Sequence, residues 1–141
     1  MANLKDKNNN PISYLFQYEN INKKTKEKEI YNIWIILTKE MRNKLKYNTN
    51  CQYFCDTTYR CIPPTFKHYK LFIISNYDFI EKKIYICAFN LIPNELTITY
   101  EFSFNKLKTN FSFNPYIITL DFAKSISNAL NKIKKECFFF I

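Results

Sequence analysis

The sequence predicts a single α/β domain with a mixed β-sheet and an N-terminal helical extension. Short apolar segments typical of strands recur from residue 51 onward, and in the second half they alternate with segments of helical periodicity. The length of 141 residues suits one domain plus an extension. An apolar content of 47%, with 18% aromatic residues, is enough for a buried core. No segment reaches the ~18 apolar residues that a membrane-spanning helix needs.

The composition narrows the range of functions. The chain contains no glycine, which excludes phosphate-binding loops built on glycines. The net charge of +9 favours an anionic partner such as nucleic acid or a membrane surface, although a lysine-rich proteome would give the same excess. The five cysteines are an odd number and the start, MANLKDKNNN, has no apolar signal segment. These features predict an intracellular, reduced protein.

Residues 1–49 are expected to form a basic polar tail followed by an amphipathic helix. Residues 1–25 are polar and read as loose chain, with a short ordered piece at 12–18. Over residues 27–46 the apolar side chains recur with helical spacing, on the face formed by Ile30, Ile33, Trp34, Leu37, Met41 and Leu45. We expect this helix to pack on the core, with a protein partner as the alternative. For the basic stretch 23–28, a solvated surface is expected and contact with DNA phosphates is the alternative.

Residues 50–141 are predicted to form the core, with the order β-β-β-α-β-α-β. The strands are expected at 51–59, 69–75, 83–91, 116–120 and 137–141, and the helices at 95–108 and 122–135. The second and third strands form an antiparallel hairpin. A strand meander followed by β-α units predicts a mixed sheet with helices on its faces.

Two aspartates stand out by their positions on this pattern. Asp56 lies in the first strand, and Asp121 directly follows the apolar fourth strand. A carboxylate at the end of a buried strand is costly without a partner or a metal, and ligands bind at that edge of open α/β sheets. If the two strands are neighbours, the carboxylates converge and suit Mg²⁺ or Mn²⁺. In the alternatives, Asp56 is a turn residue and Asp121 is a helix N-cap that accepts from the amides of Ala123 or Lys124.

Five segments carry a resemblance to a known family. In sequence order they are Asp56-Thr57-Thr58-Tyr59, Tyr69–Ile74, Leu91-Ile92-Pro93-Asn94 with Thr99-Tyr100, Thr119-Leu120-Asp121-Phe122 with Asn128-Ala129, and Cys137-Phe138-Phe139. In order and spacing they resemble the catalytic core of Mutator-like (MULE) transposases. The resemblance implies a ribonuclease-H-like sheet of order 3-2-1-4-5, counted from residue 51 and truncated after the fifth strand.

The resemblance also implies a function. Asp56 and Asp121 would be the first two catalytic acids and would hold Mg²⁺ or Mn²⁺ for DNA strand cleavage and transfer in the nucleus. The third acid of the family, a Glu, has its place beyond residue 141, so we expect an incomplete or inactive copy. Thr57, Ala123 and Phe140 depart from the Gly, Glu and His of the family's motifs.

Three other hypotheses remain open. The first is a non-enzymatic, transposase-derived remnant that binds DNA or a protein partner through its basic surface. Self-association or a partner would then use the helix at 27–46 or the edge of the C-terminal strand. The second is a small basic domain, unrelated to transposases, whose two aspartates lie far apart. The third is a zinc site from Cys51, Cys55, Cys61 and His68, for which the spacing is irregular; buried thiols are the expected alternative.

Overall fold

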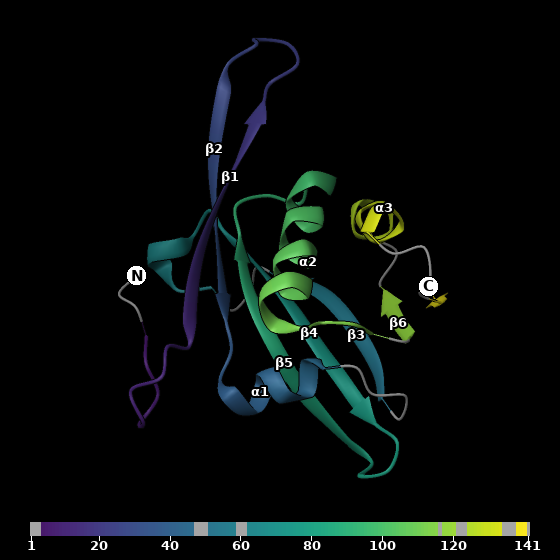
Figure 1. Ribbon diagram of the computed structural model, residues 1–141. Coiled ribbons are helices and arrows are strands. Elements are labelled where there is room, and N and C mark those ends of the chain that lie inside the picture. Colours follow the sequence, from purple (N-terminus) through teal and green to yellow (C-terminus); the bar gives the residue numbers. More distant parts are fainter. Residues whose placement is uncertain are drawn as a thin grey trace.

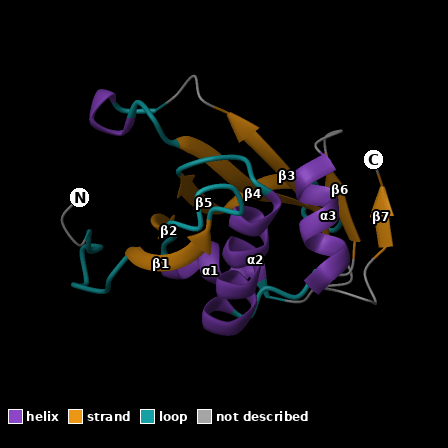
Figure 2. Cartoon of the chain, turned by 90° about the horizontal axis from the view of Figure 1, so that it is seen from above, coloured by secondary structure: helices purple, strands orange, loops and turns teal. Residues whose placement is uncertain are grey.

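The computed structural model describes residues 4–46, 51–58, 62–115, 117–120, 124–133 and 138–140. Within these residues the chain forms a mixed sheet of seven strands, in the order β1-β2-β5-β4-β3-β6-β7, and three α-helices. The predicted α/β class and the mixed sheet are confirmed. Helices α2 and α3 lie side by side over one face of the sheet (Figures 1 and 2). The elements are β1 Ser13–Ile21, β2 Lys28–Ile36, α1 Lys39–Leu45, β3 Cys51–Thr58, the 3-10 turn Pro64–Phe66, β4 Lys70–Asp78, β5 Lys83–Ile92, α2 Thr97–Phe111, β6 Ile117–Leu120, α3 Lys124–Ile133 and β7 Phe138–Phe140.

The strands from residue 51 onward lie close to their predicted positions. β4 and β5 form the predicted antiparallel hairpin, with a register shift between Ile74 and Ser75. The turn between them places Lys82 at a φ of 54°, a left-handed position that must be filled without glycine. β3 pairs antiparallel with β4 and parallel with β6, and β7 pairs parallel with β6. The strands of this part therefore follow one another across the sheet as β5-β4-β3-β6-β7.

The predicted order 3-2-1-4-5 is not the order of the sheet, which is β1-β2-β5-β4-β3-β6-β7. Two further strands, β1 and β2, extend it beside β5. They come from residues that were expected to be a loose tail and a helix. As a result β5, which was predicted at the edge of the sheet, lies in its interior. The sheet is larger than predicted because the N-terminal segment pairs with residues more than fifty positions away, such as Trp34 with Leu91.

The predicted helix at 27–46 is wrong over most of its length. Residues Lys28–Ile36 form strand β2, and only Lys39–Leu45 are helical. Ile33 and Ile35 are buried while Trp34 between them is half-exposed, which is the two-residue period of a strand. β-Branched and aromatic residues occupy six of the nine positions of this segment and favour a strand. Thr38 caps the start of helix α1, and its hydroxyl accepts from the Met41 amide at 3.2 Å.

The expected loose tail is also wrong, because residues Ser13–Ile21 form strand β1. β1 and β2 are antiparallel over nine pairs, from Ser13 with Ile36 to Ile21 with Lys28. The Ile12 amide also donates to the Leu4 carbonyl at 2.8 Å, so the chain is ordered before β1 begins. Part of this Asn- and Lys-rich tail therefore forms a strand, because its aromatic side chains pack against α2.

The core lies between the sheet and helix α2. Phe72 of β4 is fully buried, with its ring centroid 5.1 Å from that of Tyr100 and 5.4 Å from that of Phe104. Tyr53 of β3 lies on the same face and donates its hydroxyl to the carbonyls of Lys44 and Lys46, at the end of α1. Aromatic side chains from one face of the sheet and from α2 thus form one continuous core.

The opposite face of the sheet carries the intervening side chains. Thr57 of β3 contacts Tyr100 of α2, so the neighbouring Asp56 projects from the other face. In Figure 2 all three labelled helices lie on the α2 side of the sheet. Asp56 is therefore on the face without these helices.

Candidate functional site

The first predicted site residue, Asp56, lies near the carboxyl end of β3 and is exposed. It is paired across the ladder with Ile73 of β4. Because it lies inside a regular strand, the interpretation of Asp56 as a turn residue is wrong. Its strand is held on both sides, by β4 and by β6, so its backbone is fixed in place.

The second predicted site residue, Asp121, lies outside the described residues, as does Ala123, one of the two amides of its N-cap alternative. Its strand, however, is placed. β6 runs parallel to β3, with Cys55 opposite Leu120. The expectation that these two strands are neighbours is confirmed. Asp56 and Asp121 are the residues that follow this pair in the sequence.

The buried phenol of Tyr100 lies on the α2 side of β3, across the sheet from Asp56. The hydroxyls of Thr57 and Tyr100 are 2.9 Å apart. Burial raises the pKa of Tyr100 to about 12, and the negative charges of Glu95 and Asp56 act in the same direction. Tyr100 is therefore a neutral hydrogen-bonding group, which orients Thr57 beside the aspartate. Sequence reasoning placed Tyr100 on a helical face but did not link it to Thr57, the neighbour of Asp56, because that contact joins two distant elements.

An ion pair lies at the same edge of the sheet. The Lys70 Nζ is 2.5 Å from the Glu95 Oε2, joining the start of β4 to the segment before α2. Both side chains are partly exposed, so the pair contributes at most about 1 kcal/mol to stability. Since Glu95 already has a cationic partner, it is not a free carboxylate facing Asp56.

The described residues do not by themselves make a metal site. Among them, no group of three or more His, Cys, Asp or Glu side chains comes together. Mg²⁺ in proteins is usually held by one or two carboxylates together with other oxygen ligands. Of these ligands, Asp56 supplies one carboxylate. A cation at this edge depends on Asp121 as the second carboxylate. No reaction step through a metal follows from the described residues.

The cysteines do not support the zinc interpretation in the part of the chain that the structure describes. Cys51 and Cys55 are buried free thiols on the core face of β3, and Cys87 is a buried free thiol on β5. His68 is exposed in the loop before β4, and Cys61 lies outside the described residues. Burial raises the pKa of Cys55 and raises the pKa of Cys87 to about 12.

These burial effects predict low thiol reactivity in the native protein. Only the thiolate reacts, and it is suppressed at Cys55 and Cys87 at about pH 8, near the usual thiol pKa. In a variant with Cys61 and Cys137 replaced by serine, we expect Ellman's reagent to modify none of the three remaining thiols in native conditions. All three should react in denaturant. Rapid modification of the native protein would contradict the buried placement of β3 and β5.

A shallow hollow lies between the segment before β1 and helix α1. It has a volume of about 380 Å³ and is lined by two cations, Lys39 and Arg42, and by no Asp, Glu, His or Cys. Its lining consists of Asn10, Pro11, Tyr14, Leu37, Thr38, Lys39 and Arg42. Its chemistry is that of an open basic surface.

Within the described residues, no helix is both long and apolar enough to span a membrane. Comparison of the chain with protein-family models, with curated proteins and with solved structures finds no match.

Proposed function

We propose that residues 51–141 form a ribonuclease-H-like core related to the catalytic core of Mutator-like transposases, and that the protein acts on or binds DNA. The observation that carries this proposal is the strand arrangement. An antiparallel meander, β3-β4-β5, is followed by β6, which lies parallel beside β3, and by β7 beside β6. Helices α2 and α3 form the connections into β6 and β7. This is the order that the resemblance implies for this segment.

The position of Asp56 also supports the proposal. It lies on the strand that has the meander on one side and the parallel β6 on the other. Asp121 follows the end of β6 in the sequence. Two carboxylates from adjacent parallel strands would hold Mg²⁺ or Mn²⁺, and the ion would stabilise charge on phosphate oxygens during phosphoryl transfer. The protein's part is to hold Asp56 on a rigid, doubly paired strand.

Divalent-metal binding tests the shared site. We expect the protein to bind Mn²⁺, and we expect Asp56→Asn and Asp121→Asn each to weaken that binding by at least about tenfold, because each removes a negative ligand. Isothermal titration and the loss of the free Mn²⁺ signal in electron paramagnetic resonance measure this directly. Glu101→Gln is the matched control, since it removes one carboxylate that pairs with Lys132 on the surface of α2 and α3. Equal binding by all variants would contradict the shared site.

A second candidate is a non-enzymatic domain that binds DNA through its basic surface. It is favoured by the net charge of +9. In this case DNA binding falls steeply with salt and is unchanged by Asp56→Asn, by Asp121→Asn and by EDTA. A protein that binds DNA but no Mn²⁺ would decide in favour of this candidate.

A further inference from the structure

The β1–β2 hairpin continues beyond the body of the sheet as a two-stranded ribbon. β2 pairs with β5 only through Trp34, Ile35 and Ile36, whereas it pairs with β1 along its whole length. Residues 16–33 therefore form a ribbon with no third strand beside it, which we call the arm. Figure 1 shows the arm running past the end of α2, with its turn at the far end of the molecule.

The turn of the arm is ordered by local hydrogen bonds. The Asn22 Oδ1 accepts from the amides of Lys24 and Thr25, at 3.0 and 3.3 Å. The Lys26 amide donates to the Asn22 carbonyl at 2.8 Å, and Lys26 has a φ of 62°. Asparagine at the start of a turn often closes it in this way. The lysine side chains are thus presented from a defined turn.

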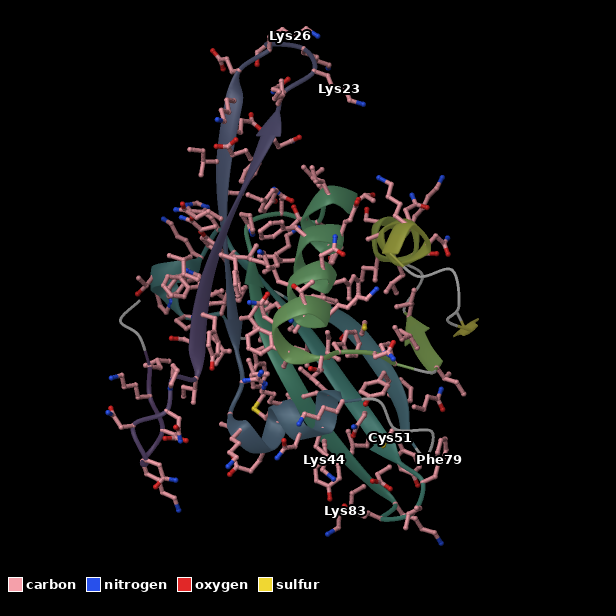
Figure 3. All side chains as sticks on the ribbon, in the orientation of Figure 1. Lys23, Lys26, Lys44, Cys51, Phe79 and Lys83 are labelled. Atoms are coloured by element: carbon pink, nitrogen blue, oxygen red, sulfur yellow. The ribbon has the colours of Figure 1, made fainter. Side chains whose placement is uncertain are left out.

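The charge at this turn is predominantly positive. Lys23, Lys24 and Lys26 are exposed and form no ion pair with any described residue, and the exposed Glu27 offsets one of these three charges. Glu19 pairs with Lys28 at 2.8 Å, whereas Glu29 accepts from the neutral Tyr31 hydroxyl at 2.6 Å and keeps its charge. The positive excess of the arm, four lysines against three glutamates, therefore lies at the turn. In Figure 3 Lys23 and Lys26 lie at the turn, at the opposite end of the molecule from Lys83 and Phe79.

The base of the arm is anchored on helix α2. The ring centroid of Tyr18 is 4.8 Å from that of Phe102, and its hydroxyl hydrogen-bonds to Thr99. The Lys106 Nζ lies over the rings of Phe16 and Phe102, at 5.2 and 5.3 Å from their centroids. The arm therefore has a fixed direction, and its turn lies away from the sheet and helices (Figure 1).

We infer that this arm enters a groove of duplex DNA, with Lys23, Lys24 and Lys26 against the phosphates. The inference rests on the proposed DNA partner. It adds which element contacts the DNA, the arm, and that the DNA is double-stranded. The major groove, about 12 Å wide, admits a two-stranded ribbon, and ribbon readers of this kind are known in general. Lysines at the turn neutralise phosphates. Ile21 and Ile30, 64% and 62% exposed, lie on one face of the arm and are available to base edges.

The chemistry of the turn distinguishes DNA from a lipid surface. All residues from Asn22 to Glu27 are polar, and the two exposed isoleucines lie behind the turn on the strands. A segment that inserts into a membrane carries its apolar side chains on the surface that meets the lipid. The β4–β5 turn, with Phe79 and Ile80, has that composition, and the arm does not.

Salt-dependent DNA binding tests the arm. The full chain is titrated with a labelled duplex of about 25 base pairs by fluorescence anisotropy at several salt concentrations. Changing Lys23, Lys24 and Lys26 to Gln is expected to reduce the slope of log K against log salt by up to about 2.7, at about 0.9 per phosphate. Affinity at low salt should fall by roughly 10- to 1,000-fold. The control changes Lys7, Lys83 and Lys108 to Gln, which removes the same charge from other exposed positions.

The outcomes separate this inference from the proposed function. A reduced slope in the arm variant alone, with binding to duplex RNA weak throughout, supports the arm. Equal losses in the arm variant and the control show that only net charge matters, which overturns the arm but leaves DNA as the partner. No binding of DNA by the unchanged protein overturns both. If the arm variant instead loses binding to phosphatidylserine–phosphatidylcholine vesicles while its DNA binding is unchanged, the arm is a membrane contact and the inference is wrong.

Discussion

Replacing Phe72 by alanine is expected to lower the free energy of unfolding by about 3–5 kcal/mol, as for other buried aromatic residues. Phe72 is fully buried and its ring meets those of Tyr100 and Phe104 edge-on. Its removal takes away apolar surface burial and leaves a cavity between β4 and α2, which the strand ladder on both sides of β4 prevents from closing. Such a loss is a large part of the ~5–15 kcal/mol that stabilises a typical domain.

Urea unfolding followed by circular dichroism measures this effect. Phe79→Ala is the matched control, because this ring lies in the β4–β5 turn, is half-exposed and contacts only the ring of Tyr77 among the aromatic pairs of the described residues. We expect it to cost less than about 1 kcal/mol. Similar losses for the two variants would mean that α2 does not pack on β4 as described.

The pair Asn90 and Ser103 is expected to show strong coupling in a double-mutant cycle. Asn90 is fully buried; its amide donates to the Phe72 carbonyl and its Oδ1 accepts from the Ser103 hydroxyl, both at 3.1 Å. Asn90→Leu keeps the shape but leaves the Ser103 hydroxyl buried without this partner. Such an unsatisfied group costs about 1–3 kcal/mol. Ser103→Ala likewise leaves the buried Asn90 Oδ1 without its hydrogen-bond donor.

The double variant, Asn90→Leu with Ser103→Ala, removes both polar groups. We expect it to be less destabilised than the sum of the single changes by about 1 kcal/mol or more, since neither group is then left unsatisfied. Thr109→Ala, an exposed position on α2, serves as the control and should change stability by less than about 0.5 kcal/mol. Additive effects at 90 and 103 would contradict the hydrogen bond between β5 and α2.

The elements after residue 50 were predictable because their patterns are local. The Tyr69–Ser75 and Lys83–Leu91 segments are dense in β-branched and aromatic residues and are separated by a polar turn, which specifies a hairpin within one short window. The spacing of apolar residues in α2 and α3 likewise repeats within each helix. The outcome at β2 was different, because Ile30, Ile33 and Trp34 fit a helical face as well as a strand.

The candidate site was predictable in part. Asp56 on a strand follows from the apolar character of residues 51–59, whereas β6 beside β3 was implied only by the family resemblance and was left as a condition by the pattern itself. Three features did not follow. The Thr57–Tyr100 contact, the pairing of Lys70 with Glu95 and the projecting arm all depend on which distant elements meet. The signal for the arm was present as two segments with several β-branched and aromatic residues, at 13–21 and 28–36, on either side of the lysine-rich turn.

The sequence by itself determined the α/β class, the hairpin of β4 and β5, the positions of α2 and α3 and the location of Asp56 on a strand. Each depends on periodicity and turn residues within a few positions of one another. Only the tertiary structure decided that residues 28–36 are a strand, because the choice is made by pairing with β1 and with the distant β5. A segment with both periodicities adopts the structure in which its neighbours pair its backbone hydrogen-bonding groups and bury its apolar side chains. Those neighbours are distant in the sequence, so a short stretch of sequence does not reveal them.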